Sequence, residues 1–567
     1  MLAQLKTLLA EKINQATGLS HLDIYKSLEV PKNESFGHLA WPVFSYAKAQ
    51  GKNPNEVAQQ LKTDLSSFLP QIQSIEVVGG FLNFKFLPQV LNESLFKALS
   101  NSTQLSKNDL GQAKTVVIDF SSPNVAKKMH VGHLRATIIG QALSNLHKAC
   151  GYEVVGLNHL GDWGTQFGKL AWSVKRWGSE LGDKLWTIEG LLELYVRFHD
   201  EAEKHPHMEV EASETFLRLE RGDQEIKKLW TKIVEVSLED YSRLYKILNV
   251  THEKTIGESF YNDRLLSVIQ LLESKNLLVE SEGARVVKFP ENENLSPCLI
   301  QKSDGASLYA TRDLASALFR KNDLKGDLLV YVVGADQALH FKQVFRVLEM
   351  CDFAWAKNCH HVSFGLYRFK EGKMSTRKGR VIHLEDVLST AIELVEGVFK
   401  EKGRNIEDSR TTIQDVAIGA VIFNDLMNDR VKNVEFDWDR AISTEGDSGP
   451  YVQYTAVRCK SLLRKKPGYQ FDPHFSAKDW NESELSLIFR LSQFAETVKA
   501  SCQQFKPNLL AQYLLQVCSQ FSHFYHENRV LDEPLAIEMR RLHLVYLTEK
   551  VLSEGLGLLG IKCPEQM

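Results

Sequence analysis

The strongest constraint on the fold lies in residues 115–140, where an apolar stretch, a polar turn and a helix follow one another directly. Residues 115–120 read Thr-Val-Val-Ile-Asp-Phe, which is typical of a buried strand. A turn rich in Ser, Pro and Asn follows, and the next helix begins at His130-Val-Gly-His133. Amide groups and the dipole at a helix start attract anions. This strand, turn and helix therefore predict a nucleotide phosphate site.

The two histidines allow two interpretations. His130 and His133 can donate hydrogen bonds to a phosphate that gains charge as pyrophosphate leaves. Gly132 has no Cβ, so a base or a sugar can approach its backbone closely. Histidines near a helix start are, however, more often caps or buried polar groups than catalysts. A His-x-Gly-His sequence is a hypothesis until its context agrees.

Composition places the chain among ordinary globular proteins. Its 567 residues predict three or four domains, at about 150 residues each. The net charge of -3 means that a nucleic-acid partner would be held by local basic patches. The eight cysteines form no Cys-x-x-Cys pair, so we expect no structural zinc, no disulfide framework and a cytoplasmic location. No apolar run approaches the ~18 residues of a membrane span.

The first 110 residues predict a small α+β domain. Residues 1–18 place Leu2, Leu5, Leu8, Leu9 and Ile13 on one helical face. This stretch contains Glu11 and no arginine, so it is interpreted as a folded helix and not as a transit peptide. Two strand-like runs follow, at residues 75–78 and 81–86.

Residues 111–410 alternate between strands and helices, which predicts a Rossmann-like parallel sheet. The expected strands are residues 115–120, 153–157, 328–334 and 360–365. A charged, mainly helical insertion is expected at about 169–300. From 411 to 567 the pattern predicts an all-α bundle. Its clearest amphipathic stretches are residues 485–502, 509–529 and 537–559.

A second motif, Lys373-Met-Ser-Thr-Arg-Lys-Gly379, follows a strand and is flanked by glycines. Together with Arg380 it places four cations within eight residues. A cationic loop of this kind can neutralise the leaving group of a triphosphate. Taken alone, such a loop is usually a solvated surface.

The two motifs together resemble the paired signature of class I aminoacyl-tRNA synthetases. The surrounding sequence resembles one member of that class, the arginyl-tRNA synthetases, from about residue 30 to the end of the chain. The matching stretches are residues 120–140, 158–168, 308–313, 449–454 and 558–565. The insertion is the least diagnostic part.

The resemblance implies an arginine–tRNA ligase that works in two steps. Arginine attacks the α-phosphate of ATP, with Mg²⁺ bound through the ATP phosphates. The arginyl group is then transferred to the 3′ end of tRNA(Arg). Family members commonly need tRNA for the first step and are commonly monomers. No editing site is expected, because neutral analogues would leave acidic groups of the pocket unpaired.

Arginine is a planar cation with five donors, so its pocket needs carboxylates and other acceptors in matching geometry. Asp119 ends the first strand, and Asp313 follows Tyr309 by four residues on an expected helix. The resemblance places arginine against Ser122, Asn124, His133, Tyr309, Asp313 and Gln337, with Asp119 at the same pocket. Without the resemblance, the residues alone favour a helix N-cap for Asp313 and a solvated loop residue for Gln337.

The resemblance also assigns the ATP site. It places ATP against His130, Gly132, His133, Lys373, Met374, Ser375 and Lys378. The usual second motif reads Lys-Met-Ser-Lys-Ser, but here Thr376 stands in place of the second lysine and Arg377 follows it. Lys127 fills a position that is thought to compensate. The expected catalytic residues are Lys127, His130, His133 and Lys373.

The expected tRNA contacts lie in the two flanking domains. Tyr451, Tyr454, Arg458 and residues 464–466 are candidates for anticodon binding, because aromatic and arginine side chains stack on unpaired bases. In the N-terminal domain, Phe36 and Asn83 are candidates for the tRNA corner. Packing explains most of these residues equally well. We expect no metal site, since the histidines at 199, 205 and 207 fit a solvated helical face better.

Two other classes of function stay open at this level. A free nucleotidylyltransferase would share the phosphate site, but the tRNA-sized flanking domains argue against it. A non-catalytic RNA-binding paralogue would share the flanking domains. The presence of Asn124, Lys127, His130, His133 and Asp313 argues against that alternative.

Overall fold

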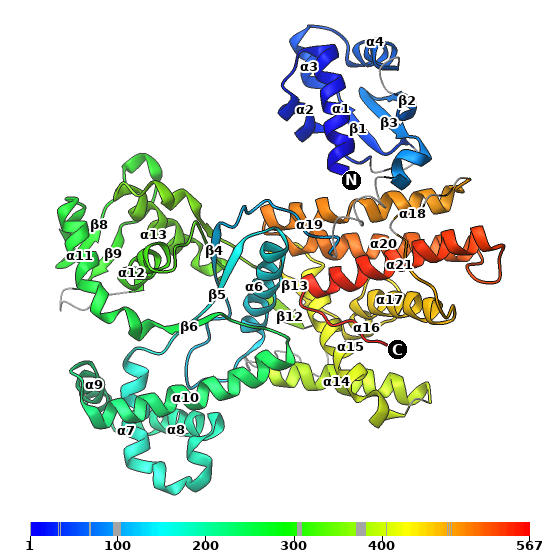
Figure 1. Ribbon diagram of the computed structural model, residues 1–567. Coiled ribbons are helices and arrows are strands. Elements are labelled where there is room, and N and C mark those ends of the chain that lie inside the picture. Colours follow the sequence, from blue (N-terminus) through cyan, green and yellow to red (C-terminus); the bar gives the residue numbers. More distant parts are fainter. Residues whose placement is uncertain are drawn as a thin grey trace.

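A computed structural model describes residues 2–31, 33, 36–66, 70–93, 104–302, 309–369, 382–403, 405–472, 474–475, 477 and 479–567. Figure 1 shows a central sheet region, a small N-terminal domain to one side, and a helical bundle that contains the C-terminus. Within the described ranges, no helix is both long and apolar enough to cross a membrane. The expected fold class is confirmed in all three parts.

The N-terminal domain packs helices against a three-stranded antiparallel sheet of order β1-β3-β2. Its elements are α1 (Leu2–Thr17), α2 (His21–Ser27), β1 (Leu39–Pro42), α3 (Phe44–Ala49), α4 (Pro54–Ser66), β2 (Ile72–Val78) and β3 (Phe81–Phe86). Four of the five residues expected on the buried face of the first helix are buried, and Leu8 is half-buried. The imidazole of His38 contacts the ring of Phe489 at 4.6 Å between centroids, which docks this domain on the C-terminal bundle.

The catalytic sheet has five parallel strands in the order β11-β10-β4-β5-β6. The strands are β4 (Thr115–Asp119), β5 (Glu153–Leu160), β6 (Lys254–Gly257), β10 (Leu328–Tyr331) and β11 (Cys359–His361). Val116 and Ile118 of β4 belong to one apolar core, while Val117 belongs to the core on the opposite face. Burial on both faces explains why this strand is a continuous apolar run.

Strand order reverses at β4. From β4 the chain passes to β5 and β6 on one side, and β10 and β11 lie on the other. Open parallel sheets bind ligands outside the carboxyl ends of the strands at such a switch point. The turn that begins after Asp119 therefore lies where a ligand is expected.

Helices cover both faces of this sheet. They are α6 (Val131–Ala149), which follows β4, and α11 (Leu265–Ser274), α12 (Tyr309–Asn322) and α13 (Ala338–Met350). Buried residues of α11, α12 and α13 form one core together with Val117 and Leu157. Residues of α6 join the other core, which continues into the C-terminal bundle.

The insertion is less purely helical than the sequence predicts. It begins with α7 (Thr165–Trp177), α8 (Ile188–Ala202), α9 (His207–Glu220) and α10 (Gln224–Ile247). The chain then returns to the sheet at β6, and a small antiparallel sheet follows, made of β7 (Leu278–Ser281), β8 (Ala284–Val287) and β9 (Cys298–Gln301). Strand β6 escapes prediction because it is a short edge strand with a polar sequence. The expected strand at 360–365 forms regular pairing only at Cys359–His361.

The C-terminal region is helical apart from one small strand pair, β12 (Tyr367–Phe369) with β13 (Val434–Phe436). Its helices are α14 (Leu384–Glu401), α15 (Ile406–Leu426), α16 (Trp438–Ile442), α17 (Gly449–Arg464), α18 (Glu482–Ser492), α19 (Phe494–Gln503), α20 (Pro507–Glu527) and α21 (Leu535–Leu558). The single helix expected at 485–502 is divided in two at Gln493. Helix α15 runs through position 410, so the predicted domain boundary near that position stays a prediction.

Candidate active site

The turn between β4 and α6 has a strained backbone. Ser121, Ser122 and Ala126 have φ angles of 72°, 49° and 61°, in the left-handed region that residues with a Cβ rarely adopt. Such strain persists only when the surrounding structure holds it, and it is concentrated at functional sites.

Helix α10 of the insertion holds this turn. The hydroxyl of Tyr241 donates to the carbonyl oxygens of Asn124 at 2.6 Å and Lys127 at 2.8 Å. The hydroxyl of Ser237, one helical turn earlier, accepts from the amide of Ala126 at 2.9 Å. These bonds fix the backbone that carries Asn124 and Lys127. The long insertion, which the sequence motifs left without a role, therefore shapes the site directly.

His130 and His133 form a reciprocal cap at the start of α6. Nδ1 of His130 accepts from the amide of Gly132 at 3.1 Å, and the amide of His130 donates to Nδ1 of His133 at 3.1 Å. The two rings lie 3.9 Å apart between centroids. A Cβ on Gly132 would come within 2.8 Å of the His130 ring, so glycine is required there by the cap itself.

The cap also determines the chemistry of both rings. Because each Nδ1 accepts a hydrogen bond, each neutral ring carries its proton on Nε2. Burial, with the neighbouring His130 and Lys127, lowers the pKa of His133 to about 3. Burial, with His383 and Lys127, also lowers the pKa of His130. Both histidines are therefore neutral Nε2–H donors at neutral pH.

The residues expected to bind arginine come from several elements. Asp313, on α12, places Oδ2 2.6 Å from Nε2 of His340 on α13. Tyr309 begins α12 and is 70% exposed. Gln337 is exposed and ends a short 3-10 helix after β10. Asn124 is exposed on the turn after β4.

Asp119 is buried and already partnered. Its Oδ2 lies 2.8 Å from Nη2 of Arg320, and its Oδ1 accepts from the hydroxyl of Ser122 at 2.8 Å. The amide of Ser122 donates to Oδ1 of Asn158 at 3.2 Å. Asp119 thus orients Ser122 in this state, while an arginine of the chain itself balances its charge.

A further carboxylate, Glu258, follows β6 and was not found from the sequence. Burial raises the pKa of Glu258 to about 7, with Asp313 and Asp162 adding to the shift and Arg312 opposing it. Asp162 is held by the amide and hydroxyl of Ser259, at 2.8 and 2.6 Å. Clustered carboxylates repel one another, so a cation that binds among them is favoured.

Glu258 predicts a pH dependence of arginine binding. Arginine is a cation and favours the ionised carboxylate, so its KM should fall as pH rises through 7. If only the ionised form binds, KM falls about tenfold between about pH 6 and about pH 8. Glu258→Gln should remove this dependence while leaving the KM for ATP unchanged. Steady-state kinetics across this pH range measure the KM for arginine, with a Ser259→Ala variant as control. A pH profile in Glu258→Gln that matches the wild type would contradict a role of Glu258 in arginine binding.

Two further histidines near these carboxylates were not found from the sequence. His159, near the end of β5, has its pKa lowered by burial, while Asp119 and Asp313 oppose the shift. His340 faces Asp313 from α13. Strand order was the missing signal, because it places β5 beside β4 and β6 beside β5.

The cations have different environments. Lys127 is exposed, and its Nζ lies 5.9 Å from the ring centroid of Tyr195 on α8. Lys128 pairs with Glu189 at 2.5 Å. The expected contacts Lys373, Met374, Ser375 and Lys378 lie outside the described residues.

The expected tRNA residues of the bundle lie on α17 or just after it. Tyr454 is 40% exposed. Arg458 stacks on the ring of Tyr525 at 4.2 Å, and the hydroxyl of Tyr451 lies 3.2 Å from that of Ser522. Tyr454 lines a cavity at this end of the bundle.

Comparison with known proteins agrees with this geometry. Residues 94–438 match the family model "tRNA synthetases class I (R), catalytic domain". The sheet and its histidine cap therefore define a class I aminoacyl-tRNA synthetase. Residues 3–86 match the "Arginyl tRNA synthetase N terminal domain" and residues 452–567 the "DALR anticodon binding domain". The chain belongs to the arginyl-tRNA synthetase family.

Individual relatives cover the whole chain. Arginine–tRNA ligase of Exiguobacterium sibiricum is 44% identical over 551 residues, 97% of each chain. That of Clostridioides difficile is 41% identical over 561 residues, 99% of this chain and 98% of the relative. Among solved structures, Thermus thermophilus arginyl-tRNA synthetase aligns with a TM-score of 0.84 at 24% identity, over 99% of this chain and 100% of that one.

Proposed function

We propose that the chain is an arginine–tRNA ligase that serves translation. It joins L-arginine to ATP, releasing pyrophosphate, and transfers the arginyl group to the 3′ end of tRNA(Arg). The observation that carries the proposal is the neutral histidine cap that follows the switch-point strand, together with the half-buried carboxylates Glu258 and Asp313. The cap suits a phosphate, and the carboxylates suit a guanidinium.

In the first step a carboxylate oxygen of arginine forms a bond to the α-phosphorus, and the bond to pyrophosphate breaks. His130 and His133 donate from Nε2 to the phosphate oxygens, and Lys127 and Lys373 offset the charge. Gly132, Met374, Ser375 and Lys378 complete the proposed ATP site. Mg²⁺ enters on the ATP phosphates, and no residue is assigned to it or to zinc.

Arginine is proposed to lie between the turn and α12. Asp313 and Glu258 face the guanidinium, and Tyr309 stacks on it. Ser122, Asn124, His133 and Gln337 take the polar groups at the other end of the substrate. Asp119 acts on arginine through its charge and through Ser122, because Arg320 already occupies one of its oxygens.

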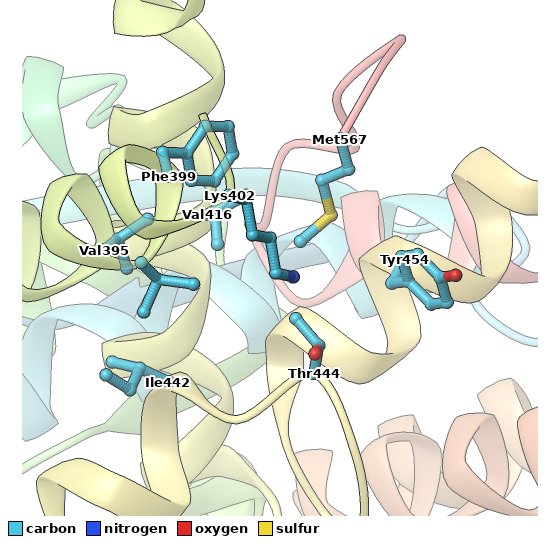
Figure 2. Close-up of a pocket in the computed structure, with 9 residues that line it drawn as sticks. Val395, Phe399, Lys402, Val416, Ile442, Thr444, Tyr454 and Met567 are labelled. Atoms are coloured by element: carbon cyan, nitrogen blue, oxygen red, sulfur yellow. The ribbon is translucent and has the colours of Figure 1, made fainter. Parts of the chain in front are cut away.

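A cavity at one end of the bundle is proposed to hold an unstacked anticodon base. It has a volume of about 240 Å³ and lies between α14, α15 and α17. Figure 2 shows Tyr454, Met567 and Lys402 around one space, with apolar side chains such as Val395 and Phe399 on the α14 side. An aromatic ring, an apolar wall and one cation suit a base and its phosphate.

Tyr454→Ala should raise the KM for tRNA(Arg) by about 5- to 100-fold, since a stacked base contributes about 1–3 kcal/mol. The KM values for arginine and ATP should stay within about twofold, because the cavity is remote from the sheet. Tyr454→Phe keeps the ring and is the matched control. Aminoacylation kinetics with varied tRNA test this; equal effects of both substitutions would contradict stacking.

The N-terminal domain offers a second proposed tRNA site. A groove of about 560 Å³ brings Phe36 and Asn83 together. Phe36 is 38% exposed and can stack on a base, while Asn83 donates weakly to the carbonyl oxygen of Glu76 at 3.4 Å. We propose that this groove takes a base from the corner of the tRNA.

The chain is proposed to act in the cytoplasm and as a monomer, with the three domains divided at about residues 110 and 410. Incubation of the purified chain with ATP, labelled arginine and total tRNA tests the function. We expect arginyl-tRNA to form and pyrophosphate exchange to require tRNA. Failure to charge tRNA would refute the proposal. Exchange without tRNA and no charging would favour a nucleotidylyltransferase.

A further inference from the structure

Arg135 lies on α6, five residues after the N-cap His130, and only 1% of its side chain is exposed. Its Nε lies 2.8 Å from Oδ2 of Asp425, which is equally buried in the last turn of α15. Removal of two charges from water is costly unless each is well paired. This ion pair links the histidine helix to the first long helix of the bundle.

The same guanidinium contacts two further segments. Its Nη1 donates to the carbonyl oxygens of Gly365 at 2.6 Å and Lys432 at 3.1 Å. Gly365 precedes β12, and Lys432 precedes β13. A Cβ at Gly365 would come within 2.7 Å of the Lys432 carbonyl, so these two segments cross closely beneath Arg135. One side chain therefore joins α6, the end of α15 and this crossing.

The segment after α15 is bonded to the bundle on its other side. Nε of Arg430 donates to the carbonyl oxygen of Phe505 at 3.0 Å, and Nζ of Lys506 lies 2.8 Å from Oδ2 of Asp429. Phe505 and Lys506 form the turn between α19 and α20. Residues 425–432 thus connect that turn to Arg135 through direct polar contacts.

A second connection joins the histidine cap to α14. The amide of Val131 donates to the carbonyl oxygen of Ile382 at 3.2 Å, and the amide of Leu384 donates to that of Met129 at 2.9 Å. Helix α14 packs against α15 in the bundle and lines the proposed anticodon cavity. A shift of α14 and α15 would therefore act on α6 from both sides.

The ion pair is incompletely bonded in this state. Within the described residues, Nη2 of Arg135 is buried and has no hydrogen-bond partner. Arg540, a comparably buried arginine inside the bundle, donates to Glu484 from Nε at 3.2 Å and from Nη2 at 3.1 Å. Its Nη1 donates to the carbonyl oxygen of Asp479 at 3.1 Å. A buried donor left without a partner is unusual and favours an alternative arrangement nearby in energy.

We propose that Arg135 and Asp425 are positioning residues through which the helical bundle, when tRNA occupies it, aligns His130 and His133 on ATP. The proposal rests on the proposed function. Movement of α15 carries Asp425, and a buried charge draws its partner with it. The rigid helix α6 then passes the displacement to the cap five residues away.

The test compares Asp425→Asn, which keeps shape and removes charge, with Arg135→Lys, which keeps charge and removes the Nη1 bonds. Arg540→Lys is the matched control, a buried ion pair within the bundle. Each full-length variant is assayed for binding of tRNA(Arg) on filters and for ATP–pyrophosphate exchange against tRNA concentration. Activity is normalised to the folded fraction from circular dichroism.

We expect Asp425→Asn and Arg135→Lys to bind tRNA within about twofold of the wild type, while tRNA-stimulated exchange falls at least tenfold. The KM for ATP should rise and that for arginine should stay unchanged. Arg540→Lys should alter neither. Normal exchange in both variants would overturn the proposal. So would a loss of exchange that is matched by an equal loss of tRNA binding, or an equal loss of exchange in Arg540→Lys. An inactive wild type would instead refute the proposed function.

Discussion

His130→Asn should lower the rate of ATP–pyrophosphate exchange by about 10²- to 10³-fold, the usual effect of removing one donor aimed at developing charge. Asparagine is a good N-cap residue, so its side chain can accept from the amide of Gly132 in place of Nδ1. It cannot reproduce the Nε2–H donor on the far side of the ring. The substitution therefore separates the cap from the chemistry.

The control for this prediction is His133→Gln. Glutamine at this position can accept from the amide of His130, as in a capping box, and also lacks the Nε2–H donor. Both variants should unfold within a few degrees of the wild type and lose exchange. Retention of exchange in His130→Asn would show that the histidine serves only as a cap. His130→Ala, which loses both functions, gives the comparison for stability.

These histidines show what sequence can and cannot separate. A cap and a catalytic donor were alternatives in the sequence, yet the cap seen in the structure leaves the same rings able to act as donors. Nδ1 serves the helix, and this very bond leaves the proton on Nε2. The amino-acid sequence alone does not reveal which ring nitrogen accepts a hydrogen bond. The motif predicted a helix start at these histidines, and α6 begins there. The geometry of the cap decides which ring nitrogen carries the proton.

The sequence predicted the elements whose apolar residues follow a regular pattern of burial. Strand β4 is buried on both faces and α1 on one, so hydrophobic period and continuity predicted them. Strand β6 has exposed or half-buried residues only, and its place is decided by pairing with β5 across about a hundred residues of chain. Pairing over such a distance leaves no local signal.

The support of the site was hidden for the same reason. Tyr241 and Ser237 read as ordinary residues of an amphipathic helix, yet they hold the strained turn. Arg320 gives no sign in the sequence that it balances the charge of Asp119. Motifs name residues that touch a ligand, whereas the residues that hold them in place depend on contacts between distant segments.

Asp313→Asn should raise the KM for arginine by roughly 30- to 1,000-fold, corresponding to about 2–4 kcal/mol for loss of a charge from a partly buried ion pair. The substitution keeps the size and the hydrogen bond to His340. It removes the negative charge that a guanidinium requires. The KM for ATP should change by less than about twofold, because ATP is bound by the turn and the cap.

The substrate itself offers the sharpest check on Asp313. Citrulline has the shape of arginine with a neutral head group, so the wild type should reject it because the carboxylates stay unpaired. Asp313→Asn should lose much of this discrimination, since an amide pairs with a neutral head group as readily as with a cation. Asp336→Asn removes an exposed carboxylate beside Gln337 and should leave the preference intact. His340→Gln tests whether Asp313 acts on arginine directly or through His340. If Asp313 served only to orient His340, Asp313→Asn and His340→Gln would weaken arginine binding equally. Neither substitution would then change the preference for arginine over citrulline.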